Sequence, residues 1–183
     1  MTITPSFGKL SAFCCHRGGM AALEFAFILP LLLILLLGAV GTFDLYKADR
    51  AASVAANTVI DLTARQAVMN DTIRDTLFAA GQGLVGRYNS GSGISMTLAS
   101  IVQDPDDGLE VAWSESTGSG STITDADISS LDLPTIPNNE SIIYIRLSSN
   151  YAPMFGSGLT FEREAVRRPR YVAAIAYEDY YDD

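Results

Sequence analysis

The chain has 183 residues, of which 48% are hydrophobic and 18% charged, and its net charge is −9. This length allows one membrane segment and one modest folded domain. Residues 44–183 hold 20 of the 21 acids and 10 of the 12 Lys and Arg residues, a net charge of −10 that should repel nucleic-acid phosphates. We therefore expect no nucleic-acid partner.

Residues 1–19 form a short, weakly basic stretch that contains Lys9 and Arg17 and no acid. Both cysteines, Cys14 and Cys15, lie in it, so residues 20–183 can neither form a disulfide nor build a cysteine-based metal site. We expect residues 1–19 to be a basic cytoplasmic leader.

Residues 20–43 are apolar, and Glu24 is their single charge. A helix of these 24 residues spans roughly 36 Å, and the hydrocarbon core of a bilayer is about 30 Å thick. The run predicts one transmembrane helix. Pro30 removes the backbone hydrogen bond to Ala26 and should kink or loosen it.

Three other interpretations of this apolar run stay open. A buried core helix is rarely so uniformly apolar. A cleaved secretory signal is a stronger rival, because Ala39-Val40-Gly41 could serve as a small-residue cleavage site, although the apolar stretch is long for one. The third is a plain single-pass anchor that is never processed.

The orientation of this segment is not decided by the positive-inside rule. Two Lys or Arg residues precede it, Lys9 and Arg17, and two follow it, Lys47 and Arg50. The free N-terminal amine and the absence of acids before the helix favour a cytoplasmic N-terminus and an exported C-terminal domain.

The residues that enter the apolar run carry a recognisable pattern, Arg-Gly-Gly-Met-Ala-Ala-Leu-Glu-Phe-Ala-Phe-Ile-Leu-Pro over 17–30. A basic leader ends in Gly19, Glu24 follows five residues later, and a Pro-Leu-Leu-Leu run begins at Pro30. This pattern resembles the prepilin signal of type IV pilins, and most closely that of the TadE/TadG-like pseudopilins of tight-adherence (Flp) pilus systems.

The resemblance implies that a prepilin peptidase cuts between Gly19 and Met20, on the cytoplasmic side of the membrane. The glycines would keep the chain extended and flexible for the protease. Glu24 would become the fifth mature residue and could pair with the Met20 ammonium of a neighbouring subunit, which sets the helix register. The plainer interpretation of Glu24 is an interfacial acid without a partner.

Residues 44–88 continue with helical periodicity, which predicts an amphipathic helix of about 50 residues, broken near Asn70 if at all. Asn70 or Asp71 could cap a fresh helix over Thr72–Arg87. Packing against the protein's own sheet is favoured over packing against a partner helix. The apolar stripe and the glycines expected at the fraying end are Leu45, Ala48, Ala52, Ala55, Val59, Leu62, Gln66, Met69 and Ile73, and Gly81, Gly83 and Gly86.

Residues 89–183 change to a pattern of strands and turns, which predicts a small antiparallel β head packed on the helix, hence an α+β fold. Residues 117–139 are polar and are expected to form a long flexible connection. A segment at residues 167–172 resembles one near the ends of Tad proteins. The predicted strands are Ile94–Gln103, Leu109–Ser116, Ser141–Tyr151 and Leu159–Val166, with a hairpin turn at 104–108.

No catalytic, metal or cofactor site stands out. The single histidine, His16, lies in the leader, so residues 20–183 cannot contain a His-based catalytic triad. Asp104, Asp106 and Glu110, with Gly108, vaguely echo a calcium loop but are expected to form a turn. We expect no cofactor and no enzyme activity, although an exported hydrolase with a carboxylate pair stays a third hypothesis.

The expected function is that of a minor pseudopilin in pilus assembly, cell adhesion and secretion, anchored in the bacterial inner membrane with a periplasmic C-terminal domain. The expected partners are other pseudopilins, Tad platform proteins, the prepilin peptidase and the lipid bilayer. The alternative is an unprocessed single-pass envelope protein with a binding head.

Overall fold

The computed structural model describes residues 17–88, 93–153 and 157–178, with the backbone alone for residues 17–19. It is an α+β protein with a long apolar N-terminal helix, α1 (Arg17–Thr63), and a small antiparallel sheet. The chain divides into two compact units, Met1–Phe43 and Asp44–Asp183. Residues 44–63 of α1 belong to the second unit, the head.

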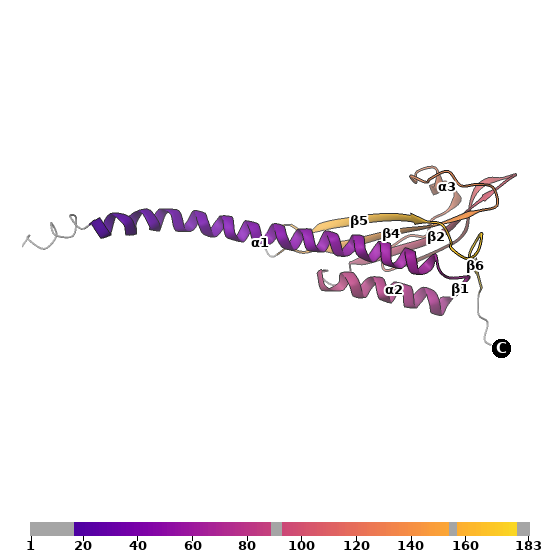
Figure 1. Cartoon of the computed structure of the whole chain (residues 1–183), viewed down its shortest axis with the longest axis horizontal. Coiled ribbons are helices and arrows are strands. Elements are labelled where there is room, and N and C mark those ends of the chain that lie inside the picture. The colour runs from indigo at the N-terminus through magenta and orange to yellow at the C-terminus, as the bar shows by residue number, and fades with distance from the viewer. Residues whose placement is uncertain (1–16, 89–92, 154–156, 179–183) are drawn as a thin grey trace, which may run out of the picture. The chain divides into compact units, whose positions relative to one another are not determined.

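The sheet of the head has four antiparallel strands in the order β3-β2-β4-β5 (Figure 1). The four predicted strands are confirmed, and each agrees with its predicted range to within one residue at either end. The alternating side chains of these strands, and the acidic turn between the first two, are local sequence patterns that predict the strands correctly. The strands are β2 (Ile94–Asp104), β3 (Gly108–Thr117), β4 (Ser141–Tyr151) and β5 (Leu159–Arg167).

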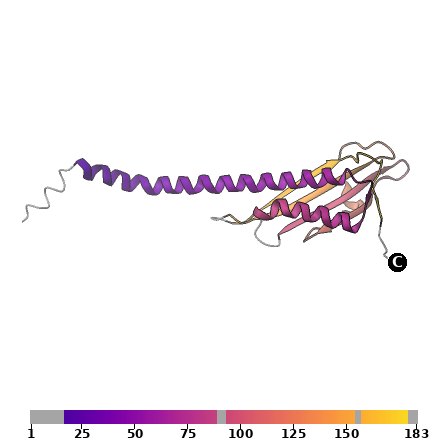
Figure 2. The ribbon, with the colours of Figure 1, turned by 60° about the horizontal axis from the view of Figure 1, so that its bottom comes forward.

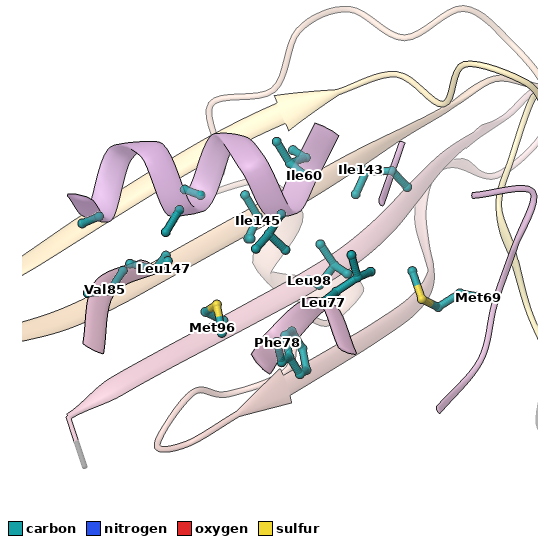
Figure 3. Packing of buried hydrophobic residues seen from close by; sticks show 14 of the residues in the cluster. Ile60, Met69, Leu77, Phe78, Val85, Met96, Leu98, Ile143, Ile145 and Leu147 are labelled. Atoms are coloured by element: carbon teal, nitrogen blue, oxygen red, sulfur yellow. The ribbon is translucent and has the colours of Figure 1, made fainter. Parts of the chain in front are cut away.

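Within the head, the end of α1 and the second helix, α2 (Asp71–Val85), lie side by side over one face of the sheet (Figures 1 and 2). Part of the predicted stripe packs against this sheet, as expected, since Ala52, Ala55 and Val59 are fully buried, whereas Leu62 is 37% exposed. Figure 3 shows the resulting core. Its buried members include Ile60, Met69, Leu77, Phe78, Val85, Met96, Leu98, Ile143, Ile145 and Leu147.

The segment between α1 and α2 is not helical, so the helix expected to reach residue 70 is shorter than predicted. α1 ends at Thr63, and a two-residue strand, β1 (Val68–Met69), pairs in parallel with β6 (Ala176–Tyr177). The C-terminal segment also forms a backbone hydrogen bond here, since the Arg170 N–H donates to the Ala64 carbonyl at 2.8 Å. A partner more than 100 residues away thus overrides the helical periodicity.

Asn70, one of the two caps that the sequence offers, is the N-cap of α2. Its side-chain oxygen accepts a hydrogen bond from the Ile73 N–H at 2.9 Å, which satisfies one of the unpaired donors of the first turn. α2 ends at Val85 and is followed by a single 3₁₀ turn, η2 (Gly86–Tyr88).

The long connection after β3 is ordered over the second face of the sheet, contrary to the expectation of a flexible loop. It contains a short helix, α3 (Asp125–Ile128), and buries the side chains of Ile123, Ile128 and Ile136. These isoleucines pack with Ala99, Ile101, Ile142 and Tyr144 of the sheet. The sheet therefore has two covered faces, one helical and one formed by this connection.

Candidate functional site

α1 is the one helix in the described part of the chain that is long and apolar enough to cross a membrane. Its most apolar stretch has no buried residue. The largest side chains there, from Phe25 to Phe43, are exposed at 40% or more. Soluble proteins rarely leave so large an apolar surface in contact with water. A lipid surround, or removal as a signal sequence, would each account for it.

Glu24 is the only charged residue on this apolar stretch, and its side chain is exposed. It has no hydrogen-bond or ion-pair partner among the described residues. Met20 lies four residues earlier, about 6 Å along the axis and on the same face of the helix. A lone carboxylate in this position needs either a water-rich boundary or a positive charge from outside this segment.

The predicted processing position lies inside the first turn of α1. The backbone from Arg17 to Met20 is helical, whereas the glycine pair was expected to keep it extended. Helix propagation from the apolar run outweighs a glycine cost of about 1 kcal/mol per residue. A peptidase acting at Gly19 would have to unwind this turn, which the same two glycines make easier.

Pro30 lies inside α1, which continues through it to Thr63. The kink expected at Pro30 stays a prediction. Further along, the Thr42 hydroxyl donates to the Gly38 carbonyl at 2.9 Å, one turn back, so this polar group needs no partner from outside the helix.

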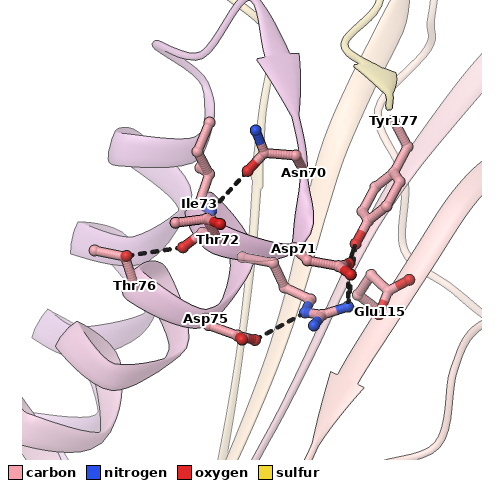
Figure 4. Close-up of polar contacts among 9 residues, drawn as sticks. Asn70, Asp71, Thr72, Ile73, Asp75, Thr76, Glu115 and Tyr177 are labelled. Carbon is pink, nitrogen blue, oxygen red and sulfur yellow. Dashed lines mark hydrogen bonds and ion pairs between the residues drawn. The ribbon is translucent and has the colours of Figure 1, made fainter. Parts of the chain in front are cut away.

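In the head, Arg74 joins three elements through its guanidinium group. Its partners Asp71, Asp75, Glu115 and Tyr177 are labelled in Figure 4. It contacts Asp71 at 2.8 Å and Asp75 at 3.0 Å on its own helix, Glu115 of β3 at 3.1 Å, and the Tyr177 hydroxyl of β6 at 3.1 Å. Desolvation lowers the pKa of Arg74, but the hydrogen bond to Asp75 and the surrounding acids raise this pKa by more. Arg74 therefore stays charged. This cluster ties α2 to the sheet and to the C-terminal segment.

Tyr177 completes the same cluster. Its hydroxyl donates to Asp71 at 2.5 Å, and its ring tilts against Trp113 at a centroid distance of 5.8 Å. Partial burial, followed by the hydrogen bond to Asp71, raises the pKa of Tyr177, which therefore remains a donor at neutral pH. No local sequence pattern marks this cluster, because its members lie up to 106 residues apart.

Two further ion pairs hold the end of α1 against β5 and the segment that follows it. Arg163 bonds to Asp49, and its Nε also donates to the Ser53 hydroxyl at 3.1 Å. Arg170, from the segment singled out at residues 167–172, bonds to Asp61. The hydrogen bond from Arg65 and the charges of Arg65 and Arg170 hold the pKa of Asp61 below its usual value, although some desolvation opposes them.

A shallow groove of about 720 Å³ runs along the outer face of α1 beside these pairs. Its floor carries three arginines, Arg50, Arg167 and Arg170, and a single acid, Asp61. Ser53, Val54, Asn57, Thr58 and Leu62 complete the lining. The sequence shows arginines at 50, 167, 168 and 170 but nothing that brings them to one surface.

The weak calcium candidate is a tight turn. The Asp104 carboxylate accepts the N–H groups of Asp106 at 2.8 Å and Asp107 at 3.1 Å, and Gly108 supplies the positive φ of 89° that closes the hairpin. These two bonds lower the pKa of Asp104. In the part of the chain that the structure describes, no three His, Cys, Asp or Glu side chains are grouped to hold a metal ion.

Comparisons with known proteins supply no relative. No family model, no curated protein and no solved structure matches the chain, so its function is argued from its own residues.

Proposed function

We propose that this chain is a membrane-anchored pseudopilin of a tight-adherence pilus system, processed between Gly19 and Met20 and assembled by lateral packing of its apolar helix. The observation that carries the proposal is the string at residues 17–30, in which a glycine pair, a lone glutamate and a leucine run follow a basic leader. The exposed apolar surface of α1 and the single charge upon it are what such packing requires.

Glu24 has a specific role in this proposal. Cutting after Gly19 creates an ammonium group at Met20, and a neighbouring helix displaced along its axis presents that group to Glu24. The pairing neutralises a carboxylate that is otherwise unpaired in a low-dielectric surround, where an isolated charge is costly. It thereby sets the axial offset between subunits. Glu24→Gln should leave cleavage intact and reduce co-purification of the chain with its pilin-like partners.

Cleavage is tested by expressing the full chain with and without a prepilin peptidase and measuring its mass in the membrane fraction. The expected result is loss of residues 1–19 only when the peptidase is present. Gly19→Leu should abolish the cut, because a side chain at that position blocks close approach of the backbone to the protease. Gly18→Ala is the matched control and should still be cut.

The second candidate function is an unprocessed single-pass envelope protein whose head binds a partner. The helical backbone at Gly18–Met20 favours it, because a peptide bond inside a helix is a poor protease substrate. An intact chain in peptidase-positive cells would support this candidate over processing. A cut near Gly41, with release of the head from the membrane, would support an exported protein with a conventional signal.

A further inference from the structure

The groove on α1 is an island of positive charge on an acidic domain. We call it the arginine groove. Its lining residues include Arg50, Val54, Asp61, Arg167 and Arg170. The head around it carries a net charge of −10. The groove reverses that sign, since three arginines face one carboxylate.

Two of these arginines are not used by the fold. Arg50 and Arg167 are exposed, and their guanidinium groups make no hydrogen bond or ion pair with any described residue. Arg170 shares Asp61 with Arg65, so one carboxylate serves two guanidinium groups. The floor therefore retains positive charge that acidic groups from outside could neutralise.

The length of the groove and the order of charged and apolar side chains along it indicate what it could bind. Arg50 and Asp61 are eleven residues apart on α1, about 16 Å along the helix, and Arg170 bonds to Asp61 at the far end. Val54 and Leu62 expose apolar surface on the same face, at 45% and 37%. An extended segment of five or six residues fits this length. It should carry acids at both ends and apolar rings between them.

We propose that the arginine groove binds residues 178–183 of a second copy of this chain. That segment reads Glu-Asp-Tyr-Tyr-Asp-Asp, with two acids on each side of two tyrosines. Fully extended, it spans roughly 17 Å, close to the length of the groove. Its acids meet the arginines at the two ends, and its tyrosines lie on the exposed apolar side chains between them.

The segment is assigned to another copy because its own begins beside the first turn of α2, where the Tyr177 hydroxyl bonds to Asp71. The Glu178 N–H is bonded to the Met69 carbonyl at 2.8 Å, and β1 and β6 lie beside the C-terminal end of α1 (Figure 1). Arg50 lies 13 residues before Thr63, about 20 Å back along the helix. Groove and segment are different surfaces, so the contact is head-to-tail and can join successive copies. It does not depend on processing at Gly19.

Peptide binding tests the groove directly. The full-length chain in detergent, carrying Asp182→Arg and Asp183→Arg to disable its own segment, is titrated against a fluorescent Glu-Asp-Tyr-Tyr-Asp-Asp peptide and anisotropy is recorded. Saturable binding that weakens with added salt is expected. Adding Arg50→Glu with Arg167→Glu should weaken it about tenfold or more. Arg87→Glu, an exposed arginine elsewhere on the head, should change it less than about twofold.

Mixing two defective variants tests whether the segment acts between copies. Differently tagged full-length chains with Arg50→Glu and Arg167→Glu should not pull each other down beyond a common background, and neither should chains with Asp182→Arg and Asp183→Arg. A mixture of the two variants should associate, because the intact segment of one enters the intact groove of the other. An own-chain contact gives no such recovery and would overturn the proposal.

Other occupants give different results. Equal peptide binding by the groove variant and the Arg87→Glu control would show that the segment binds elsewhere. Binding of phosphatidylglycerol at Arg50 and Arg167, without binding of the peptide, would make the groove a lipid site. Either outcome contradicts the proposal. Unchanged fluorescence of Trp113, which lies in the core, confirms that each variant is folded.

Discussion

Asp104 shows how a single residue's chemistry is set by its own turn. Its carboxylate caps two backbone N–H groups in the hairpin, and Asp106 and Asp107 are exposed. The spacing that echoes a calcium loop thus serves local backbone geometry. Asp127 does the same at the start of α3, where it lies in the first turn. Its carboxylate accepts from the N–H and the hydroxyl of Thr124, and both bonds lower its pKa.

We expect Asp104→Asn to flatten the acid side of the stability profile. Because the folded pKa of Asp104 is depressed, the stability it contributes is complete above the unfolded value, about 4, and is lost as the pH falls through the lower folded value. Asparagine keeps the turn but cannot titrate. Urea unfolding of the full chain across the acid range measures this slope. Asp106→Asn, which caps nothing, is the control, and an identical slope in all three proteins would exclude this role.

At the scale of the element, Gly81 of α2 permits close packing and does not mark a helix end. Gly81, Gly83 and Gly86 were expected to mark a fraying helix end, and α2 does end at Val85. Yet a Cβ at Gly81 would lie 2.6 Å from the Met96 sulfur and 2.9 Å from a Val59 methyl group. The missing side chain lets α2 approach α1 and the sheet closely.

Two glycine substitutions on α2 should therefore have opposite effects. Gly81→Ala should lower the free energy of unfolding by about 1–3 kcal/mol, because Val59 and Met96 are fully buried and cannot yield freely. Gly83→Ala has open space around its Cβ and should raise it by about 0.5–1 kcal/mol through helix propensity. Chemical denaturation followed by Trp113 fluorescence compares them. Destabilisation of both would indicate a general intolerance of α2.

At the scale of the whole molecule, the head is stabilised by a core with contributions from most of its length. Trp113 of β3 donates its indole N–H to the Ile175 carbonyl at 2.7 Å, which brings the C-terminal segment back to the sheet. One face of the sheet buries residues from both helices and the other buries isoleucines of the long connection. The apolar surface of residues 20–43 stays outside this core.

The free energy of unfolding of the head should therefore fall when a large side chain is removed from the core, and should not change when one is removed from residues 20–43. Ile145→Ala should cost about 2–5 kcal/mol, since Ile145 is fully buried at the centre of the sheet. Leu33→Ala removes a side chain that is 49% exposed on α1 and should leave the unfolding midpoint of the head unchanged. Urea titration of both variants in the same detergent, read from Trp113, makes the comparison. A large shift for Leu33→Ala would show that residues 20–43 support the head.

Much of the architecture could be predicted from local patterns. The alternation in β2 to β5, the Asp-Pro-Asp-Asp-Gly turn and the Asn70 cap depend on neighbours a few residues away, and so does the apolar run from Met20 to Phe43. The prepilin-like string at 17–30 belongs to the same class, and it remains the basis of the proposed function.

Contacts between distant residues decided the rest. α1 ends at Thr63 because Arg170 takes the Ala64 carbonyl, and the connection after β3 orders because Ile123, Ile128 and Ile136 find an open sheet face. The arginine groove joins residues 50–62 to residues 167 and 170. Periodicity and turn chemistry act over a few residues along the chain, whereas burial and charge pairing depend on which segments the fold brings together, so only the tertiary structure could reveal these features.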